Sequence, residues 1–163
     1  MNIVKKTFDL LKKNDLRLAF CESCTGGLVS SLITKIPGSS KVFVGAIIAY
    51  SNETKKEILH VKKETLDNEG AVSEQCALEM VNGLSQILRF DIGVSITGIA
   101  GPDGGSLKKP IGFVCFGFNI LGNLFTMKMN FHGSRIKIQK KASFYVYNVI
   151  FSEIKKKFGK ILV

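Results

Sequence analysis

An unbroken run of apolar residues at positions 42–50 is the feature that most restricts the fold of this chain. A strand with one face in water would alternate apolar and polar residues, whereas an unbroken apolar run suits a strand that is covered on both faces. The run is also much shorter than the roughly 20 apolar residues that a membrane-spanning helix needs. The chain must therefore supply helices that cover a buried sheet.

The remaining patterns supply these helices and further strands. Short apolar segments at 16–22 and 91–97 predict two more strands, and the pair Gly122-Asn123 between two apolar runs predicts a hairpin near the C-terminus. No repeat or linker divides the chain, so we interpret residues 1–163 as one domain. We predict an α/β fold: a three-layer α/β/α sandwich with a mixed, mostly parallel sheet and an antiparallel hairpin near the C-terminus.

The charge of the chain favours an anionic partner. Its 23 basic and 13 acidic residues give a formal net charge of +10. Only Arg17, Arg89 and Arg135 are arginines, however, and arginine is the side chain that nucleic-acid recognition favours. The lysines are spread in pairs along the whole sequence. We therefore expect a solvated basic surface and a small anionic substrate rather than a nucleic acid.

The N-terminus and the cysteines indicate an intracellular protein. Residues 1–6 lack the apolar segment of a secretory signal, so we expect a cytoplasmic protein with no membrane contact. The four cysteines are too few and too scattered for a disulfide framework. Cys21 and Cys24 form a C-x-x-C pair, which leaves a zinc or redox role as an alternative. His60 and His132 stand alone, and we expect neither a metal nor a cofactor.

Three loops carry the residues that could take part in catalysis or ligand binding. Ligands of α/β sheets bind beyond the carboxyl ends of the strands, which selects residues 22–27, 50–55 and 98–109. The first loop places Ser23 before Gly26 and Gly27 at a helix start, where backbone N–H groups favour an oxyanion or a phosphate. The second loop supplies Tyr50, Asn52 and Lys55. A serine needs a base to become a nucleophile, and a partly buried neutral lysine can be that base.

The third loop has tight backbone geometry with accessible N–H groups. Residues 97–106 include four glycines and one proline after a strand end. The loop matches neither the Walker-type pattern nor G-x-G-x-x-G, so the two common modes of mononucleotide binding are not indicated.

Five motifs in these and neighbouring segments occur in a fixed order along the chain. They are Glu22-Ser23-Cys24-Thr25-Gly26-Gly27, Tyr50-Ser51-Asn52-Glu53-x-Lys55, Gly70-Ala71-Val72-Ser73, Gly98-Ile99-Ala100-Gly101-Pro102-Asp103-Gly104-Gly105, and Lys109-Pro110-Ile111-Gly112. Together they resemble the CinA C-terminal domain family, in its stand-alone form. The resemblance implies a nicotinamide mononucleotide deamidase, which hydrolyses the carboxamide to nicotinic acid mononucleotide and ammonia in pyridine nucleotide recycling.

The resemblance also implies roles for individual residues. Ser23 would be the nucleophile, Lys55 the base, and Tyr50 a donor or proton relay beside them. Near Arg135 the family usually has a second arginine four residues on, where this chain has Gln139. The implied substrate-binding residues are Thr25, Gly26, Gly27, Asn52, Thr97, Gly98, Gly101 and Arg135, with the helix start at 25–27 as oxyanion hole and the glycine loop and Arg135 at the ribose phosphate.

Two other functions remain open at the level of the sequence. A non-catalytic nucleotide- or polyanion-binding module, associated with competence or DNA damage, would explain the charge and the glycine loops without using Ser23 or Lys55. An amidase with Cys24 as a thiol nucleophile would need His60 or His132, and neither lies in the three loops. Small α/β domains often pair through a helix or a sheet edge, so a homodimer is also an expectation.

Overall fold

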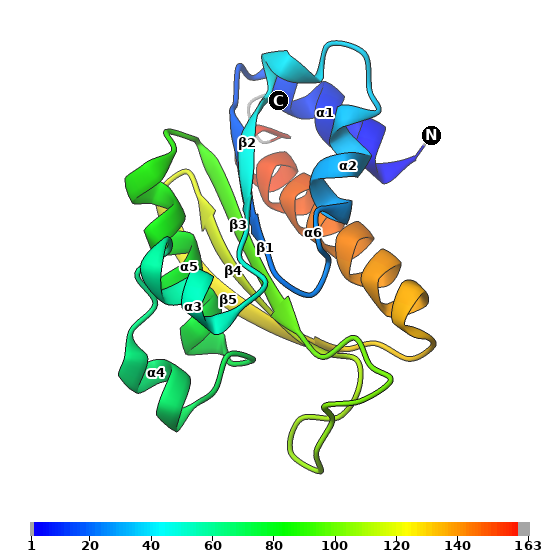
Figure 1. The fold of residues 1–163 in the computed structure, drawn as a ribbon. Helices are drawn as coiled ribbons and strands as arrows, with labels where there is room; N and C mark the ends of the chain where they lie inside the picture. The colour runs from blue at the N-terminus through cyan, green and yellow to red at the C-terminus, as the bar shows by residue number, and fades with distance from the viewer. Residues whose placement is uncertain (1, 160–163) are drawn as a thin grey trace.

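The computed structural model describes residues 2–159, in which helices and strands alternate up to β3 and are followed by a hairpin and a long helix (Figure 1). The elements are α1 (Ile3–Lys13), β1 (Leu18–Glu22), α2 (Leu28–Thr34), the 3₁₀ turn η1 (Ser39–Lys41), β2 (Phe43–Ile48), α3 (Asn52–Glu57), α4 (Lys63–Asn68), α5 (Glu74–Ile87), β3 (Ile92–Gly98), β4 (Phe113–Ile120), β5 (Asn123–Asn130) and α6 (Arg135–Phe158).

The strands of the described chain form one sheet in the order β2-β1-β3-β4-β5. β1 pairs in parallel with β2 and β3, whereas β4 pairs in antiparallel fashion with β3 and β5. The sheet is therefore mixed, and the β4–β5 hairpin is its antiparallel end.

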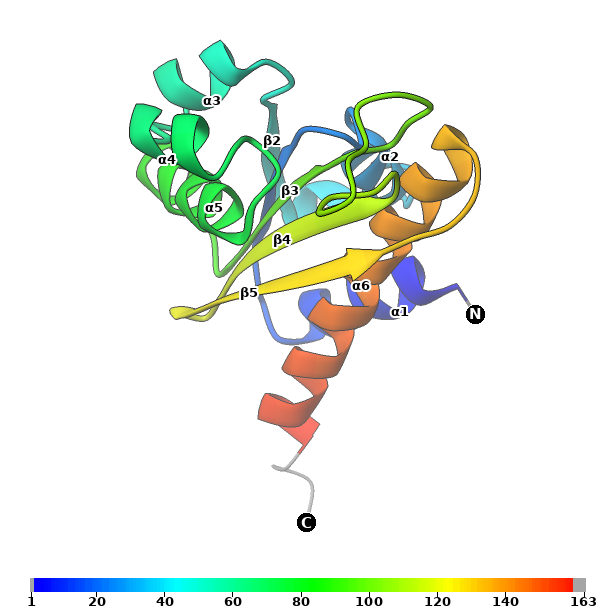
Figure 2. The ribbon, with the colours of Figure 1, turned by 90° about the horizontal axis from the view of Figure 1, so that it is seen from below.

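Helices cover both faces of this sheet. α1, α2 and α6 lie on one face, and α3, α4 and α5 lie on the other (Figures 1 and 2). Successive residues of β1 consequently enter different cores, because strand side chains alternate between faces. Phe20 packs on the side of α1, α2 and α6, and Cys21 packs on the side of α5. The predicted α/β sandwich is confirmed.

The apolar run at 42–50 occupies a different place from the one its pattern suggests. Residues 43–48 of the run form β2, which is an edge strand, and they are half-buried or exposed, whereas Val42 and Ala49 beside them are buried. The strands that are buried along nearly their whole length are β1 and β3, because each has a neighbour on both sides as well as helices on both faces.

Glycines shift two element boundaries from their predicted positions. The pattern suggests a helix from residue 25, but Gly26 and Gly27 have φ values of 58° and 95°, so α2 begins only at Leu28. The hairpin turn uses Leu121 and Gly122, at φ 53° and 83°, rather than the predicted pair one residue later. Positive φ at both turn residues matches the twist of the strands they join.

Because β1, β2 and β3 run parallel, their carboxyl ends lie together at one end of the sheet. The N–H of Ala49 donates to the carbonyl of Glu22 over 2.8 Å, and the N–H of Ser23 donates to the carbonyl of Ile96 over 2.9 Å. These bonds tie the ends of the neighbouring strands β2 and β3 to the end of β1, and the loops that follow the three strands lie together.

Within residues 2–159, no helix is both long enough and apolar enough to cross a membrane.

Candidate active site

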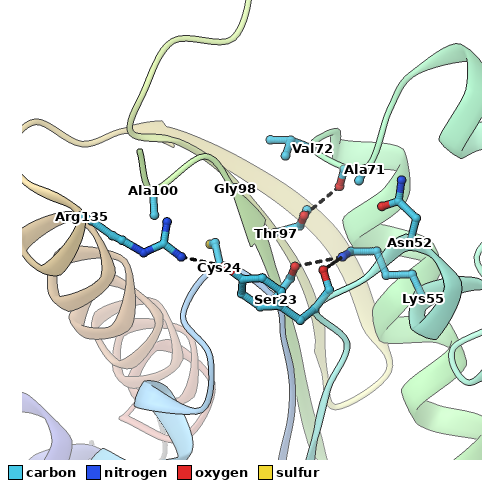
Figure 3. Close-up of a pocket in the computed structure, with 11 residues that line it drawn as sticks. Ser23, Cys24, Asn52, Lys55, Ala71, Val72, Thr97, Gly98, Ala100 and Arg135 are labelled. Carbon is cyan, nitrogen blue, oxygen red and sulfur yellow. Dashed lines mark hydrogen bonds between the residues drawn. The ribbon is translucent and has the colours of Figure 1, made fainter. Parts of the chain in front are cut away.

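Ser23 lies immediately beyond the end of β1, and its side chain is buried. It retains 7% of its accessible surface and borders a cavity of about 210 Å³ at the carboxyl edge of the sheet. Its Oγ lies 2.9 Å from Nζ of Lys55, which comes from a different segment of the chain (Figure 3). The serine and the lysine therefore form the pair that the sequence could propose only as a hypothesis.

Lys55 belongs to α3, which starts at the N-cap Ser51, and its side chain turns inward. Only 1% of its surface is exposed. Besides Ser23, Nζ donates to the carbonyls of Ala49 at 2.9 Å and Tyr50 at 3.3 Å. Burial lowers the pKa of this amine, because a charged group loses the solvation that water supplies. Burial therefore shifts the protonation equilibrium of Lys55 toward the neutral amine.

Glu22, which had no assigned role, is a fully buried carboxylate that begins the nucleophile loop. It accepts hydrogen bonds from the backbone N–H groups of Gly27, Val29 and Ser30, and from the Ser30 hydroxyl, at 2.6–3.1 Å. The carboxylate thus satisfies the positive end of α2 from within the protein. The first turn of α2 is consequently closed to a substrate oxyanion or phosphate.

This capping changes which backbone groups of the loop can meet a ligand. The N–H of Gly27 donates to Glu22, and the N–H of Gly26 donates to the carbonyl of Ser23 at 3.1 Å. The N–H groups of Cys24 and Thr25 make no backbone hydrogen bond within the described residues. Of the backbone N–H groups at 25–27 that the sequence suggested as oxyanion donors, only that of Thr25 is free to bind a ligand. The N–H of Cys24 is a second free donor that the sequence did not suggest.

The Cys24 side chain also borders the cavity, but its environment disfavours a thiolate. Burial raises the pKa of this thiol to about 12. Neither His60 nor His132 is among the residues around the cavity. Cys21 is a free, buried thiol whose Sγ donates to the carbonyl of Met80. The geometry therefore lends no support to a thiol nucleophile or to a Cys21–Cys24 redox pair.

Arg135, the first residue of α6, reaches across the mouth of the cavity. Its Nη1 donates to the carbonyl of Gly101 at 2.7 Å, and its Nη2 donates to the Tyr50 hydroxyl at 2.6 Å. The phenol of Tyr50 is thus held by Arg135, and its ring is 59% exposed. Only the backbone carbonyl of Tyr50 contacts Lys55. Arg135 therefore links the loops of Tyr50 and Gly101 to the start of α6.

Gln139 lies one turn further along α6, where the family usually has a second arginine. Its Nε2 donates to the carbonyl of Cys24 at 2.8 Å. The side chain therefore braces the nucleophile loop, and nothing in its contacts directs it to a phosphate.

The structure brings together most of the residues expected in the site. Ser23, Tyr50, Asn52, Lys55, Thr97, Gly98 and Arg135 border the cavity (Figure 3). Thr97 is buried, and its hydroxyl donates to the carbonyl of Ala71, so it positions the wall of the cavity. Four expected residues do not border the cavity: Thr25, Gly26, Gly27 and Gly101.

Three bordering residues had no expected role: Ala71, Val72 and Ala100. A fourth, Cys24, was expected only as the nucleophile of the alternative thiol amidase. Ala71 and Val72 belong to the motif at 70–73, and this motif is the one sequence feature that could have assigned them to the site. Their small and apolar side chains give no chemical indication of a site, so only the fold reveals their position.

Comparison with known proteins places this geometry in a family. The family model of the CinA C-terminal domain matches residues 1–154. The chain belongs to the CinA C-terminal domain family. It is 46% identical over 151 residues to a CinA-like protein of Petrotoga mobilis, and 48% identical over 142 residues to one of Kosmotoga olearia. These alignments cover 93% and 87% of the chain but 38% and 34% of the relatives, so the chain spans about a third of their length.

Solved structures of CinA proteins share the whole fold. The CinA superfamily protein of Enterobacter cloacae has a TM-score of 0.88 at 33% identity, and the match covers 93% of this chain and 90% of that one. The competence/damage inducible protein CihA of Agrobacterium tumefaciens has a TM-score of 0.89 at 34% identity, with 92% of each chain covered.

Proposed function

We propose that this CinA-family protein hydrolyses the carboxamide of nicotinamide mononucleotide to nicotinic acid mononucleotide and ammonia, in pyridine nucleotide recycling, through an acyl-enzyme on Ser23. The observation that carries the proposal is the buried amine of Lys55, 2.9 Å from the Ser23 hydroxyl at the wall of a cavity. Burial disfavours the charged form of a lysine, and a neutral amine beside a serine can act as its base.

The three oxygen neighbours of Lys55 can accept from the three N–H groups of an ammonium, and they also accommodate the neutral amine that the proposed reaction needs. A neutral amine has two N–H groups and one lone pair. The two N–H groups can donate to the carbonyls of Ala49 and Tyr50, which lie at 2.9 and 3.3 Å. The lone pair is then directed to the remaining neighbour, the hydroxyl of Ser23, and can accept its proton.

In the proposed reaction, Ser23 Oγ attacks the carboxamide carbon while its proton passes to Lys55. The tetrahedral intermediate collapses with cleavage of the C–N bond, and the proton on Lys55 passes to the leaving nitrogen, which departs as ammonia. Water then attacks the nicotinoyl ester, giving its proton to Lys55, and the ester bond breaks. Ser23 recovers its proton from Lys55, which returns both residues to their starting state.

The oxyanion would be stabilised by backbone N–H groups of the nucleophile loop. The groups on Cys24 and Thr25 are the candidates, because those on Gly26 and Gly27 are already engaged. Donors that are fixed before the reaction stabilise developing charge without reorganisation. In this arrangement Glu22 and Gln139 act as positioning residues that hold the loop from its two sides.

Arg135 provides a test of how the substrate's phosphate is bound. Its guanidinium has five N–H donors, and the contacts with Gly101 and Tyr50 use two of them. We expect Arg135→Ala to lower kcat/KM for nicotinamide mononucleotide roughly 30- to 150-fold. This corresponds to a loss of about 2–3 kcal/mol of transition-state stabilisation. Turnover of the dephosphorylated riboside should barely change. Equal losses with both substrates would instead assign Arg135 to support of the loops.

The proposed base predicts the direction of the pH dependence. Protonated Lys55 cannot accept the Ser23 proton, so kcat/KM should rise with pH and reach a plateau. Because burial lowers the pKa of Lys55, the midpoint should lie below the ordinary range of a lysine. Initial rates measured from acid to alkaline pH give this midpoint. A rate that falls as pH rises through this range would contradict the assignment.

One assay separates this proposal from a non-catalytic nucleotide- or polyanion-binding module. The purified protein is incubated with nicotinamide mononucleotide in the presence of a chelator, and ammonia and nicotinic acid mononucleotide are measured. We expect both products in equal amounts. A binding module would release neither, and binding without turnover would overturn the proposal.

A further inference from the structure

The two helical layers of the sandwich differ in charge. In α3, α4 and α5, acidic residues outnumber lysines by six to three. In α1 and α6, ten lysines and Arg135 stand against the two carboxylates of Asp9 and Glu153. The spacing of the lysine pairs along the sequence predicts an evenly charged surface, but the fold places most of the net charge of +10 on one face of the sheet. The ten lysines are the pairs 5–6, 12–13 and 140–141, the triple 155–157, and Lys137.

The exposed surface of α1 and α6, here called the basic face, is largely unneutralised. The two helices lie side by side on the sheet (Figures 1 and 2), and the Thr7 hydroxyl of α1 donates to the Tyr147 carbonyl of α6 at 3.2 Å. All ten lysines are exposed. Within residues 2–159, the two carboxylates pair with Lys5 and Lys156, so eight lysines of the face have no carboxylate partner. Such a surface attracts anions.

Phe151 is an aromatic side chain among four of these lysines. It lies between two shallow hollows of about 380 and 430 Å³. Lys6 and Lys13 of α1 border the first hollow, and Lys155 and Lys156 of α6 border the second. Phe151 is half-buried and belongs to neither of the two hydrophobic clusters of the described chain. The ring therefore offers an apolar surface beside positive charge, and the packing of the core does not use it.

From these observations we propose that the basic face binds single-stranded nucleic acid without sequence specificity, with a base against Phe151 and phosphates at the surrounding lysines. Surfaces that bind single strands combine positive charge, which follows the backbone, with aromatic side chains on which bases stack. Lysine attracts a phosphate as a point charge, whereas bidentate reading of base edges favours arginine. The bases of a duplex are already stacked inside it, so the Phe151 ring favours a single strand.

The basic face lacks the apolar row that a membrane-binding surface needs. Helices that lie in a membrane interface present large apolar side chains to the lipid. Among the large apolar residues of α1 and α6, only Ile136 is exposed, and about 22 Å of helix separates it from Phe151. Ile136 follows Arg135 at the cavity mouth, so Phe151 also lies far from the catalytic cavity. Nucleic-acid binding and the proposed hydrolysis therefore need not compete.

Fluorescence anisotropy of a labelled thymidine oligonucleotide measures this binding. A length of about 15 nucleotides is within the usual site sizes of single-strand binding surfaces. At an ionic strength of about 0.15 M we expect a Kd of about 1–100 μM, the usual range of non-specific binding. The logarithm of the association constant should fall linearly with the logarithm of the salt concentration. Its slope should be about −3, because each phosphate neutralised by one of the four lysines around Phe151 contributes about −0.7.

Removing two of these lysines should weaken binding and flatten its salt dependence. We expect Lys13→Gln combined with Lys155→Gln to raise Kd about tenfold and to bring the slope to about −1.5. Lys56→Gln combined with Lys63→Gln is the matched control, because it removes the same charge from α3 and α4. Its Kd should stay within about twofold of the wild type, since salt screens charges more than about 8 Å away.

Replacing the aromatic ring should weaken binding without changing its salt dependence. We expect Phe151→Ala to raise Kd about five- to tenfold, because one stacked base is lost. The slope should remain about −3, since stacking releases no counterion. Phe151→Leu, which keeps an apolar side chain without an aromatic face, is the second variant in case the alanine variant unfolds. Thermal unfolding shows whether each variant is folded.

Several results would each overturn the proposal. Equal weakening by the two lysine double variants would mean that the net charge, and not the basic face, attracts the strand. Folded Phe151 variants that bind like the wild type would remove the aromatic contact. Tighter binding of the corresponding duplex would exclude a single-strand site. Displacement of the oligonucleotide by vesicles that contain phosphatidylserine, but not by vesicles of phosphatidylcholine alone, would assign the face to a lipid surface.

Discussion

Replacing the proposed nucleophile should abolish turnover while leaving the fold intact. In Ser23→Ala we expect hydrolysis of nicotinamide mononucleotide to fall about a thousandfold or more, because Lys55 is hydrogen-bonded to no other hydroxyl among residues 2–159. The substitution removes one oxygen from a nearly buried side chain, so the unfolding midpoint should stay close to that of the wild type. Steady-state ammonia release and a thermal unfolding curve measure the two quantities.

Cys24→Ala is the matched control for this prediction. The change also trims one heavy atom from the next residue along the cavity, and it should retain most of the activity. The thiol pKa of about 12 gives the physical reason, since the group stays protonated and makes a weak nucleophile. Full activity in Ser23→Ala together with none in Cys24→Ala would reverse the two assignments.

Removing the proposed base should be nearly as damaging, and the nature of the replacement should not matter. We expect both Lys55→Met and Lys55→Arg to lower kcat by at least about a hundredfold. Methionine approximates the length of the lysine chain without a basic nitrogen. Arginine keeps the positive charge but remains protonated, so it cannot accept the proton of Ser23.

The comparison of the two Lys55 variants separates a base from a charge. If Lys55 acts by its charge, Lys55→Arg should keep substantial activity and Lys55→Met should not. Because Lys55 is buried, thermal unfolding of both variants has to be measured alongside the rates. Only losses of activity in folded protein count for either interpretation.

Several local features of the fold follow from short-range chemistry and were predictable. Ser51 and Ser73 are of a residue type that favours N-caps, and each side chain accepts from the N–H three residues on. The sequence predicts a closing helix over residues 134–158, and α6 spans Arg135–Phe158, because its apolar residues recur at helical spacing and nothing interrupts them. The predicted helix boundary was wrong where backbone conformation decided it. Gly26 and Gly27 have positive φ, so α2 starts later than the sequence pattern predicts.

The sequence by itself determined the fold class, the three loops of the site and the candidate pair Ser23 and Lys55. The fold class and the loops follow from hydrophobic periodicity and from the order of the strands, whereas the choice of Ser23 and Lys55 as a pair rests on the resemblance to the CinA C-terminal domain family. The burial of Lys55 was decided only by the tertiary structure, because spacing alone makes it a solvent-exposed helix residue. The same holds for the capping of α2 by Glu22, the brace from Gln139 and the concentration of lysines on α1 and α6. Each of these features depends on how distant segments pack in the folded chain, and a local sequence pattern does not predict that packing.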